Sequence, residues 1–314
     1  MKQSQPLRVE DPNYASFGTA RSINSALWFV NNTTLENRIL GYLGRYKDKY
    51  DVTLYAFVFS GSHYHPLAHF PGKNRAYFYR DLNARAAEAV RFLVPQFPGG
   101  PLLERRYSEQ AVPLTQEDIE EEFFYCALQP VHSGLCERIS EYPGYNSFHD
   151  AICGIKRTVS FINWADFNAQ RRHNHQVKLK DFVVKYELAY NRIPGYEHLS
   201  QKEYKELMLS KLEKRRVEIV SALKAQGHRF MTNEELLAVI PGTTARNPKK
   251  SKRNSPRPLV LTRCVQARKS FLEKYFSILV AYKKAIVRFF AGELSVEFPP
   301  GTYRPPGLLI RSSD

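Results

Sequence analysis

The chain has 314 residues, 43% of them hydrophobic, and can bury the core of one large domain or of two ordinary ones, which excludes a wholly disordered protein. Its formal net charge of +15 comes from the second half, because residues 1–155 hold 15 Lys and Arg against 17 Asp and Glu, whereas residues 156–314 hold 31 against 14. This excess predicts a polyanionic partner, nucleic acid before an acidic membrane surface, because each cation placed on a phosphate releases counterions.

Several other classes of protein are disfavoured. No stretch approaches the roughly 20 apolar residues that span a bilayer, and the first residues lack both a basic amphipathic anchor and the apolar segment of a signal peptide. We therefore expect a cytoplasmic, nucleoid-associated protein with no membrane partner. The cysteines lack the close pairing of a zinc site and are too few for a disulfide framework, so we expect buried free thiols at Cys126, Cys136, Cys153 and Cys264.

The first half of the chain alternates between strand and helix patterns. Bulky apolar residues mark the strands, and the stretch Thr115-Gln116-Glu117-Asp118 has the form of a capping box at a helix start. In chain order we predict a strand at 26–30, a helix at 35–50, strands at 52–59 and 63–70, a helix at 80–93, a strand at 106–112 and a helix from 115 to about 128. This order predicts an α+β fold, with an antiparallel sheet and helices packed on one face.

The second half is predicted to be mainly helical and basic. Apolar residues at helical spacing predict helices at 182–189, 202–226 and 267–291. Residues 245–259 carry six Lys and Arg and three prolines, which predicts an exposed segment. The expected organisation is an N-terminal tail (1–18), a first domain (19–155), a helical region (156–240), a basic linker or arm (241–259) and a C-terminal helix with a Pro-rich tail (260–314).

Two histidines, His63 and His65, follow an apolar run in the predicted sheet. Because side chains alternate along a strand, both imidazoles point to the same face, where they could form half of a metal site. Taken alone, a His-x-His pair in a strand is more often a surface feature than a metal site. Proline cannot donate to a sheet ladder, so Pro66 predicts an irregularity just beyond the pair.

The helix predicted after the capping box carries a polar stripe. Four positions separated by four, three and four residues lie along one side of it: Asp118, Glu122, Tyr125 and Gln129. The apolar positions expected to pack on the sheet lie largely on another side: Ile119, Phe123, Ala127 and Leu128. Without the histidines, the stripe would indicate a solvated face; with them, it supplies a tyrosine and an amide oxygen to a common site.

These motifs together resemble a known family. The blocks "HYH", "RDLNARAAEAV", "LLERRYSEQAV" and "FFYCALQPVHSGLCERISEYPGYNSF" occur in that order between about residues 57 and 148. The combination resembles the single-tyrosine HUH transposases and, within them, the REP-associated tyrosine transposases. The resemblance implies a ferredoxin-like sheet with the histidine pair on a central strand and a nucleophilic tyrosine on a later helix.

The resemblance assigns roles to particular residues. It makes His63 and His65 metal ligands, Tyr125 the catalytic nucleophile and Gln129, four residues after the tyrosine, the third ligand. Many relatives have asparagine rather than glutamine at this last position, and Met-Pro-Asn rather than Gly61-Ser62 before the first histidine.

The chemistry needs these residue types. A phenol has an ordinary pKa of about 10 and is a poor nucleophile at neutral pH, so another group must lower the barrier. A divalent metal, Mg²⁺ or Mn²⁺, could orient the scissile phosphate and neutralise charge on its oxygens. By resemblance, Tyr125 would attack a phosphate of single-stranded or hairpin DNA, forming a 5′-phosphotyrosine and releasing a 3′-hydroxyl that could later reverse the reaction.

Basic residues are expected to contact DNA outside this site. Arg105 and Arg106 lie where relatives have basic residues near bound DNA. Sequence-independent phosphate contact is also expected for five residues of the basic segment: Lys249, Lys250, Lys252, Arg253 and Arg257.

Two alternatives stay open at this point. One is a non-catalytic DNA-binding protein on the same scaffold. The other is a metal-dependent nuclease that activates water between His63, His65 and a carboxylate such as Glu122, for which Tyr125→Phe should leave activity largely intact. The sequence also leaves a monomer and a homodimer undecided.

Overall fold

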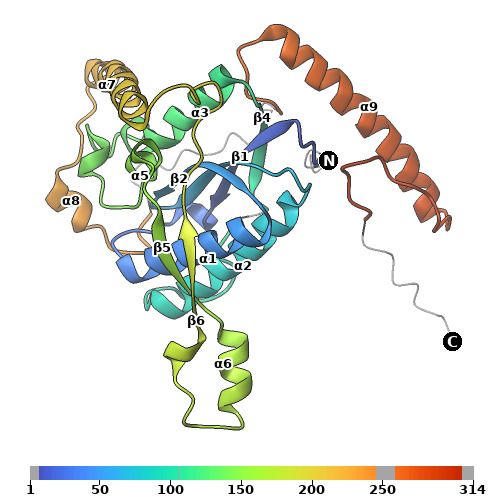
Figure 1. The fold of residues 1–314 in the computed structure, drawn as a ribbon, viewed down its shortest axis with the longest axis horizontal. Helices are drawn as coiled ribbons and strands as arrows, with labels where there is room; N and C mark the ends of the chain where they lie inside the picture. The colour runs from blue at the N-terminus through green and yellow to red at the C-terminus, as the bar shows by residue number, and fades with distance from the viewer. Residues whose placement is uncertain (1–6, 105, 245–258, 306–314) are drawn as a thin grey trace.

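The computed structural model describes residues 7–104, 106–244 and 259–305. Figure 1 shows a central sheet surrounded by helices, a two-stranded arm that projects from it, and a long helix near the C-terminus.

The central sheet is formed by β1 (Tyr14–Arg21), β2 (Thr53–Ser60), β3 (His63–His69) and β4 (Ser108–Pro113). Its order is β2-β3-β1-β4, and all neighbouring strands are antiparallel. Helix α1 (Thr33–Lys49) connects β1 to β2, and α2 (Arg75–Leu93) connects β3 to β4. This succession and strand order are those of a ferredoxin-like sheet, so the predicted α+β fold class is confirmed.

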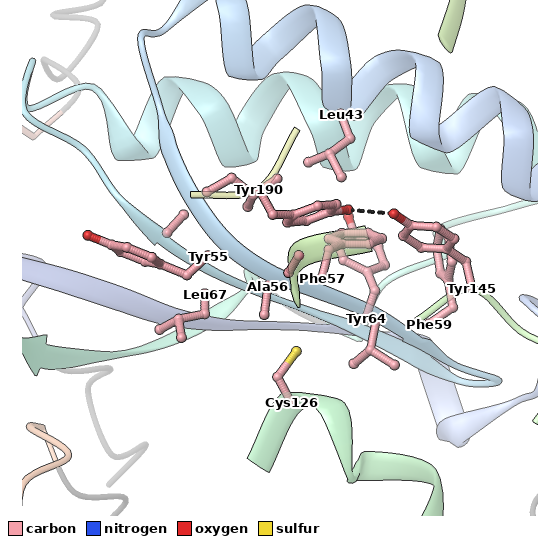
Figure 2. Close-up of a cluster of buried hydrophobic side chains, with 14 of the residues drawn as sticks. Leu43, Tyr55, Ala56, Phe57, Phe59, Tyr64, Leu67, Cys126, Tyr145 and Tyr190 are labelled. Carbon is pink, nitrogen blue, oxygen red and sulfur yellow. Dashed lines mark hydrogen bonds between the residues drawn. The ribbon is translucent and has the colours of Figure 1, made fainter. Parts of the chain in front are cut away.

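Helices lie on both faces of the sheet. Figure 2 shows Leu43 of α1 above the strands and Cys126, which belongs to α3 (Gln116–Ala127), below them. Between α1 and the sheet lies an aromatic layer in which the hydroxyls of Tyr145 and Tyr190 form a hydrogen bond of 2.9 Å. The expectation that all helices pack on one face is therefore right for α1 and α2 but wrong for α3, which covers the opposite face. The four cysteines are free thiols, as predicted, but only Cys126 and Cys136 are buried.

The start of α3 agrees with its capping signal. Thr115 Oγ1 accepts a hydrogen bond from the backbone N–H of Asp118 at 3.2 Å. The predicted apolar positions are at most 3% exposed: Ile119, Phe123, Ala127 and Leu128. A second short helix, α4 (Gln129–His132), follows with Pro130 in its first turn, where the missing N–H costs nothing.

The strand predicted at residues 26–30 is wrong. The first strand, β1, begins earlier, within the segment expected to be a tail, and ends in the expected first domain. Residues of β1 are mostly small, yet they pair with strands on both sides. The bulky residues 26–30 instead form an irregular segment that makes backbone hydrogen bonds to two distant parts of the chain. The N–H of Leu27 donates to the carbonyl oxygen of Thr243, and the N–H of Phe29 donates to that of Gly61. Their bulk reflects burial of single side chains such as Phe29 rather than a ladder.

The helix predicted at residues 182–189 is also wrong. Strand β6 (Val183–Leu188) instead pairs with β5 (Arg157–Ile162) in an antiparallel hairpin. Helix α6 (Trp164–Arg171) belongs to the segment that connects the two strands. The β-branched residues of both segments favour this pairing, which a helical spacing of apolar residues does not reveal.

The remaining helices lie mainly in the second half, where the predictions at 202–226 and 267–291 are confirmed by α7 and α9. The elements are α5 (Phe148–Cys153), α7 (Gln201–Ala225), α8 (Asn233–Leu237) and α9 (Val265–Phe290), with short 3₁₀ turns η1 (Ile23–Ser25), η2 (Ile139–Glu141) and η3 (Leu179–Phe182). Helix α7 packs on α4 and α5. None of the helices in the described ranges has the length and apolar character needed to cross a membrane.

Candidate active site

A cleft of about 1190 Å³ lies on the face of the sheet that α3 covers. One wall comes from β1, β3, α3 and α4, and contains His63, His65, Tyr125 and Gln129. The other wall comes from the chain between His228 and Thr244, including Leu236 of α8. The four residues predicted to act together therefore line one cavity.

Strand β3 holds the two histidines on the same face, as predicted. Their rings are 4.7 Å apart, and the side chains are only 9% (His63) and 4% (His65) exposed. The ladder with β1 lacks the pairs at His65 and Pro66, although the register is the same on both sides of this gap. The irregularity predicted from Pro66 is thus an interruption of hydrogen bonding and leaves the strand in place.

This interruption helps to orient His65. In the shared register Gly18 is opposite Pro66, which has no N–H to donate, and the Gly18 carbonyl oxygen lies 3.0 Å from Nδ1 of His65. Since a carbonyl can only accept, Nδ1 carries the proton and Nε2 carries the lone pair. Thr19 Oγ1, also 3.0 Å from Nδ1, supports the same ring orientation.

His63 has the same tautomer for a different reason. The amide nitrogen of Gln129 can only donate, and it lies 3.3 Å from Nε2 of His63. Nε2 is therefore the acceptor, and the proton on Nδ1 is donated to Ser62 Oγ at 3.1 Å. Both imidazoles thus carry their lone pair on Nε2, and a metal-ligating histidine commonly donates its other nitrogen to such a partner.

Gln129 completes the group. Its side chain is 8% exposed, and its Oε1 atom is buried and accepts no hydrogen bond from the described residues. A buried carbonyl oxygen without a donor costs free energy unless another group binds it. No cluster of three or more His, Cys, Asp or Glu suited to a metal occurs in the part of the chain that the structure describes. Two imidazole nitrogens and an amide oxygen are donor types that bind divalent cations.

Tyr125 lies beside this donor set on α3. Its side chain is 42% exposed, and its ring packs edge-on against Phe17 at 5.5 Å and His65 at 6.4 Å. The ring of His132 lies 5.4 Å away on its other side. The ring is thus held by aromatic neighbours while the residue stays accessible from the cleft, as a nucleophile must be.

The polar stripe on α3 is only partly in the cleft. Glu122 lines the cleft together with Tyr125 and Gln129, whereas Asp118 accepts a hydrogen bond from Thr115 at the start of the helix. Burial, and then the negative charges of Glu121 and Asp118, raise the pKa of Glu122 to about 7. Near neutral pH this carboxyl is therefore present in both protonation states.

The raised pKa of Glu122 predicts a pH dependence of the free energy of unfolding. Because the pKa in the folded protein exceeds the ordinary value of 4.5, ionisation of Glu122 opposes folding. The free energy of unfolding of the wild type therefore falls as the pH rises from about 4.5 to 7. Above pH 7 the loss of stability caused by this ionisation is constant. We expect Glu122→Gln to raise the free energy of unfolding by about 1–3 kcal/mol at pH 8 and to change it little at pH 4.5. Urea unfolding at both pH values measures this, with the exposed Glu117→Gln on the same helix as control. An equal gain at both pH values would contradict the assignment.

Sequence reasoning missed Arg21. It is the cross-strand partner of His63, so its side chain lies on the same face, and it lines the cleft. Among the described residues, its guanidinium has no hydrogen-bond or ion-pair partner, and a half-buried cation of this kind is suited to an anion. The register of β1 would have identified it, but β1 was not predicted.

Other predicted DNA contacts lie away from the cleft or outside the described residues. Arg106 is exposed just before β4 and does not line the cleft; the positive charge of its side chain lowers the pKa of Tyr282 on α9, against the larger opposing effect of burial. The other positions lie outside the described ranges: Arg105, Lys249, Lys250, Lys252, Arg253 and Arg257. Contact with DNA remains a prediction for all of them.

Comparison with known proteins found similarity among solved structures. No model of a protein family matches the sequence, and no curated protein matches it. Among solved structures, the chain is similar to a REP-associated tyrosine transposase bound to a REP hairpin, with a TM-score of 0.40 and 18% sequence identity. The similarity covers 49% of this chain and 88% of that one.

Proposed function

We propose that the protein is a metal-dependent endonuclease and strand transferase of single-stranded DNA that acts through a 5′-phosphotyrosine at Tyr125. One observation carries the proposal: a single cleft holds an accessible tyrosine, two histidines with Nε2 lone pairs and a buried glutamine oxygen that accepts no hydrogen bond from the described residues. The motif resemblance of the sequence supports the same assignment.

His63, His65 and Gln129 would hold the metal. Two imidazole nitrogens and one neutral oxygen suit Mn²⁺ at least as well as the harder Mg²⁺. When bound, the cation supplies positive charge to the oxygens of the scissile phosphate. The hydrogen bonds to Gly18, Thr19 and Ser62 already fix both imidazole rings in the orientation that binding needs. The amide of Gln129, whose nitrogen faces Nε2 of His63, would turn to present Oε1 to the cation.

Tyr125 would carry out the bond exchange. Its phenolic oxygen forms a bond to phosphorus as the bond from phosphorus to the 3′ oxygen breaks, and one proton moves in net from the phenol to the released 3′ oxygen. Glu122 lines the same cleft three residues earlier on α3, and its pKa of about 7 suits it to accept and return that proton. Attack by another 3′-hydroxyl on the phosphotyrosine reverses these changes and joins a new strand.

Arg21 would hold the phosphate from the β1 side. Its guanidinium offers several donors to phosphate oxygens in a cleft that is partly shielded from water. No acidic side chain among the described residues forms an ion pair with the Arg21 guanidinium, so its positive charge is not neutralised within the protein.

Arg21→Gln is therefore expected to slow formation of the covalent adduct by about 10²-fold. The loss should shrink sharply on an oligonucleotide whose scissile phosphate is replaced by a neutral methylphosphonate, because the charge that the arginine recognises is then absent. Arg91→Gln, at an exposed position near the end of α2, is the control. An equal loss on both oligonucleotides would argue against phosphate contact.

The assay for the proposed function uses labelled single-stranded oligonucleotides that carry candidate hairpins. The purified protein is incubated with Mn²⁺, with Mg²⁺ or with a chelator, and denaturing gels are examined for a slowly migrating protein–DNA adduct. We expect an adduct only with metal. Binding without cleavage across a broad set of substrates would favour a non-catalytic DNA-binding protein on this scaffold.

A second candidate function is favoured by the pKa of Glu122. A carboxyl with a pKa of about 7 in the same cleft could act as general base for water, making the protein a metal-dependent nuclease with no covalent intermediate. The two candidates differ in one respect: hydrolysis by water survives Tyr125→Phe, whereas adduct formation does not. Glu122→Gln should impair both.

A further inference from the structure

A rigid arm projects from the sheet domain on the side of α1. It consists of residues 157–188, in which β5 and β6 form the stalk and α6 and η3 form the end (Figure 1). The two strands are paired along their whole length, from Arg157 opposite Leu188 to Ile162 opposite Val183. Six residues of extended chain span about 20 Å, so the stalk sets the end of the arm apart from its base.

Two glycines of α1 fix the stalk to the domain. A Cβ atom on Gly41 would lie 2.1 Å from the carbonyl oxygen of Ser160, and one on Gly44 would lie 2.5 Å from a methyl carbon of Val159. The helix can therefore approach β5 closely only because both positions lack a side chain. Arg45 adds a cation–π contact, its guanidinium carbon 4.0 Å from the ring centre of Phe161.

The end of the arm has a small core of its own. Phe167 of α6 is 4% exposed and packs edge-on against Trp164 at 5.9 Å and Phe182 at 5.6 Å. These contacts hold α6 and η3 together beyond the stalk. The end of the arm is thus a folded unit on a fixed support.

The surface of this unit carries an excess of positive charge. Residues 163–182 contain four Lys and Arg against two acidic residues, Asp166 and Asp181, and all four cations lie within residues 171–180. We call the four the basic tip, and all of them are exposed: Arg171, Arg172, Lys178 and Lys180. None of them forms an ion pair with a residue that the structure describes, whereas Lys211 and Arg215 of α7 both pair with Glu120.

We propose that the basic tip binds the phosphate backbone of duplex DNA that flanks the strand held in the cleft. The choice of DNA rests on the proposed function; the presence of an anion site rests on the unneutralised charge. The tip projects away from α8, which contributes to the cleft wall (Figure 1). Only a stiff polyanion keeps phosphates at a defined distance from the cleft, and duplex DNA is stiff over about 150 base pairs, whereas a single strand is flexible.

The test compares two triple variants of the full chain. The tip variant is Arg172→Gln, Lys178→Gln and Lys180→Gln, which leaves Arg171 in its contact with Phe167. The control variant removes the same charge from exposed positions of α7: Lys202→Gln, Lys205→Gln and Lys214→Gln. Because all six side chains are exposed, both variants should melt at the wild-type temperature.

Binding is measured by fluorescence anisotropy in EDTA, so that no cleavage occurs. One probe is a hairpin with a stem of about 20 base pairs and a single-stranded tail; the other is the tail alone. The tip variant should bind the hairpin about 10- to 100-fold more weakly than the wild type at 0.15 M salt, with a slope of log K against log salt that is smaller by about 2–3. It should bind the tail alone as the wild type does.

Three outcomes would overturn the proposal: unchanged binding of the hairpin by the tip variant, an equal loss in the control variant, or an equal loss on the tail alone. The first would mean that the tip makes no contact, the second that only net charge matters, and the third that the partner is single-stranded. Absence of a covalent adduct with the wild type would refute the proposed function without altering this comparison.

Discussion

Replacing Tyr125 by phenylalanine is expected to abolish the covalent protein–DNA adduct, lowering its yield by at least about 10³-fold. The substitution removes only the hydroxyl and keeps the ring between Phe17, His65 and His132. Because the residue is 42% exposed, the free energy of unfolding should change by no more than about 0.5 kcal/mol. The loss would therefore report on chemistry and leave folding and DNA binding intact.

The matched control is Tyr77→Phe. Tyr77 is similarly exposed, at 46%, but belongs to α2 on the other face of the sheet, where its ring contacts Tyr303. This variant should form the adduct at the wild-type rate. Cleavage that persists in Tyr125→Phe with a free 5′-phosphate would identify water as the nucleophile and support the role of Glu122 as a base.

The second large effect is expected from removing a metal ligand. His65→Ala should lower adduct formation by about 10²–10³-fold and should remove the Mn²⁺ binding that calorimetry or electron paramagnetic resonance detects in the absence of DNA. His65 is the sharper choice, because its Nδ1 is held by Gly18 and Thr19, whereas the amide nitrogen of Gln129 is bonded to the other histidine, His63. Chelation of the metal should have the same effect on the wild type.

Two further variants separate a ligand from a structural residue. Gln129→Glu keeps an oxygen donor and adds a negative charge, so it should bind Mn²⁺ at least as tightly as the wild type, whereas Gln129→Leu should bind it poorly. His69→Gln is the control on the same strand, since Nε2 of His69 bonds the carbonyl oxygen of Pro12, away from the cleft. Wild-type Mn²⁺ affinity in both His65→Ala and Gln129→Leu would show that these residues are not ligands.

Much of the site could be predicted because its parts are local in sequence. An alternating pattern places His63 and His65 on one face, and the helical spacing on α3 puts Tyr125 and Glu122 on one side. What the spacing could not predict is burial. Asp118 belongs to the same stripe but serves the start of the helix, and only the packing of α3 on the sheet decides which members reach the cleft.

The errors have a common physical origin in long-range pairing. β1 consists mostly of small residues that become buried because neighbours cover it on both edges, and no local pattern reveals this. Arg21 was missed with it, since only the register with β3 brings this residue beside His63. Likewise, β6 has apolar residues that fit a helix in isolation, and its pairing with β5 across α6 decides its structure.

The departure at Pro66 illustrates the same point for the site itself. In the sequence, a proline next to the histidine pair predicts an irregularity in the strand. In the structure, β2 pairs with Pro66 through Phe57, the register with β1 is kept, and the Gly18 carbonyl oxygen accepts from His65. Pro66 is unfavourable for strand pairing, yet it lies opposite the Gly18 carbonyl that orients His65, a candidate metal ligand.

The most direct test of the central claim is to locate the covalent bond. The adduct formed with Mn²⁺ is digested with trypsin and nuclease, and the modified peptide is sequenced by mass spectrometry. Cleavage after Arg106 and Arg138 releases residues 107–138, which contain two tyrosines, Tyr125 and the buried Tyr107. We predict a nucleotide 5′-phosphate on Tyr125. Cleaved DNA with no modified peptide, or a modification on any other residue, would contradict the proposed mechanism.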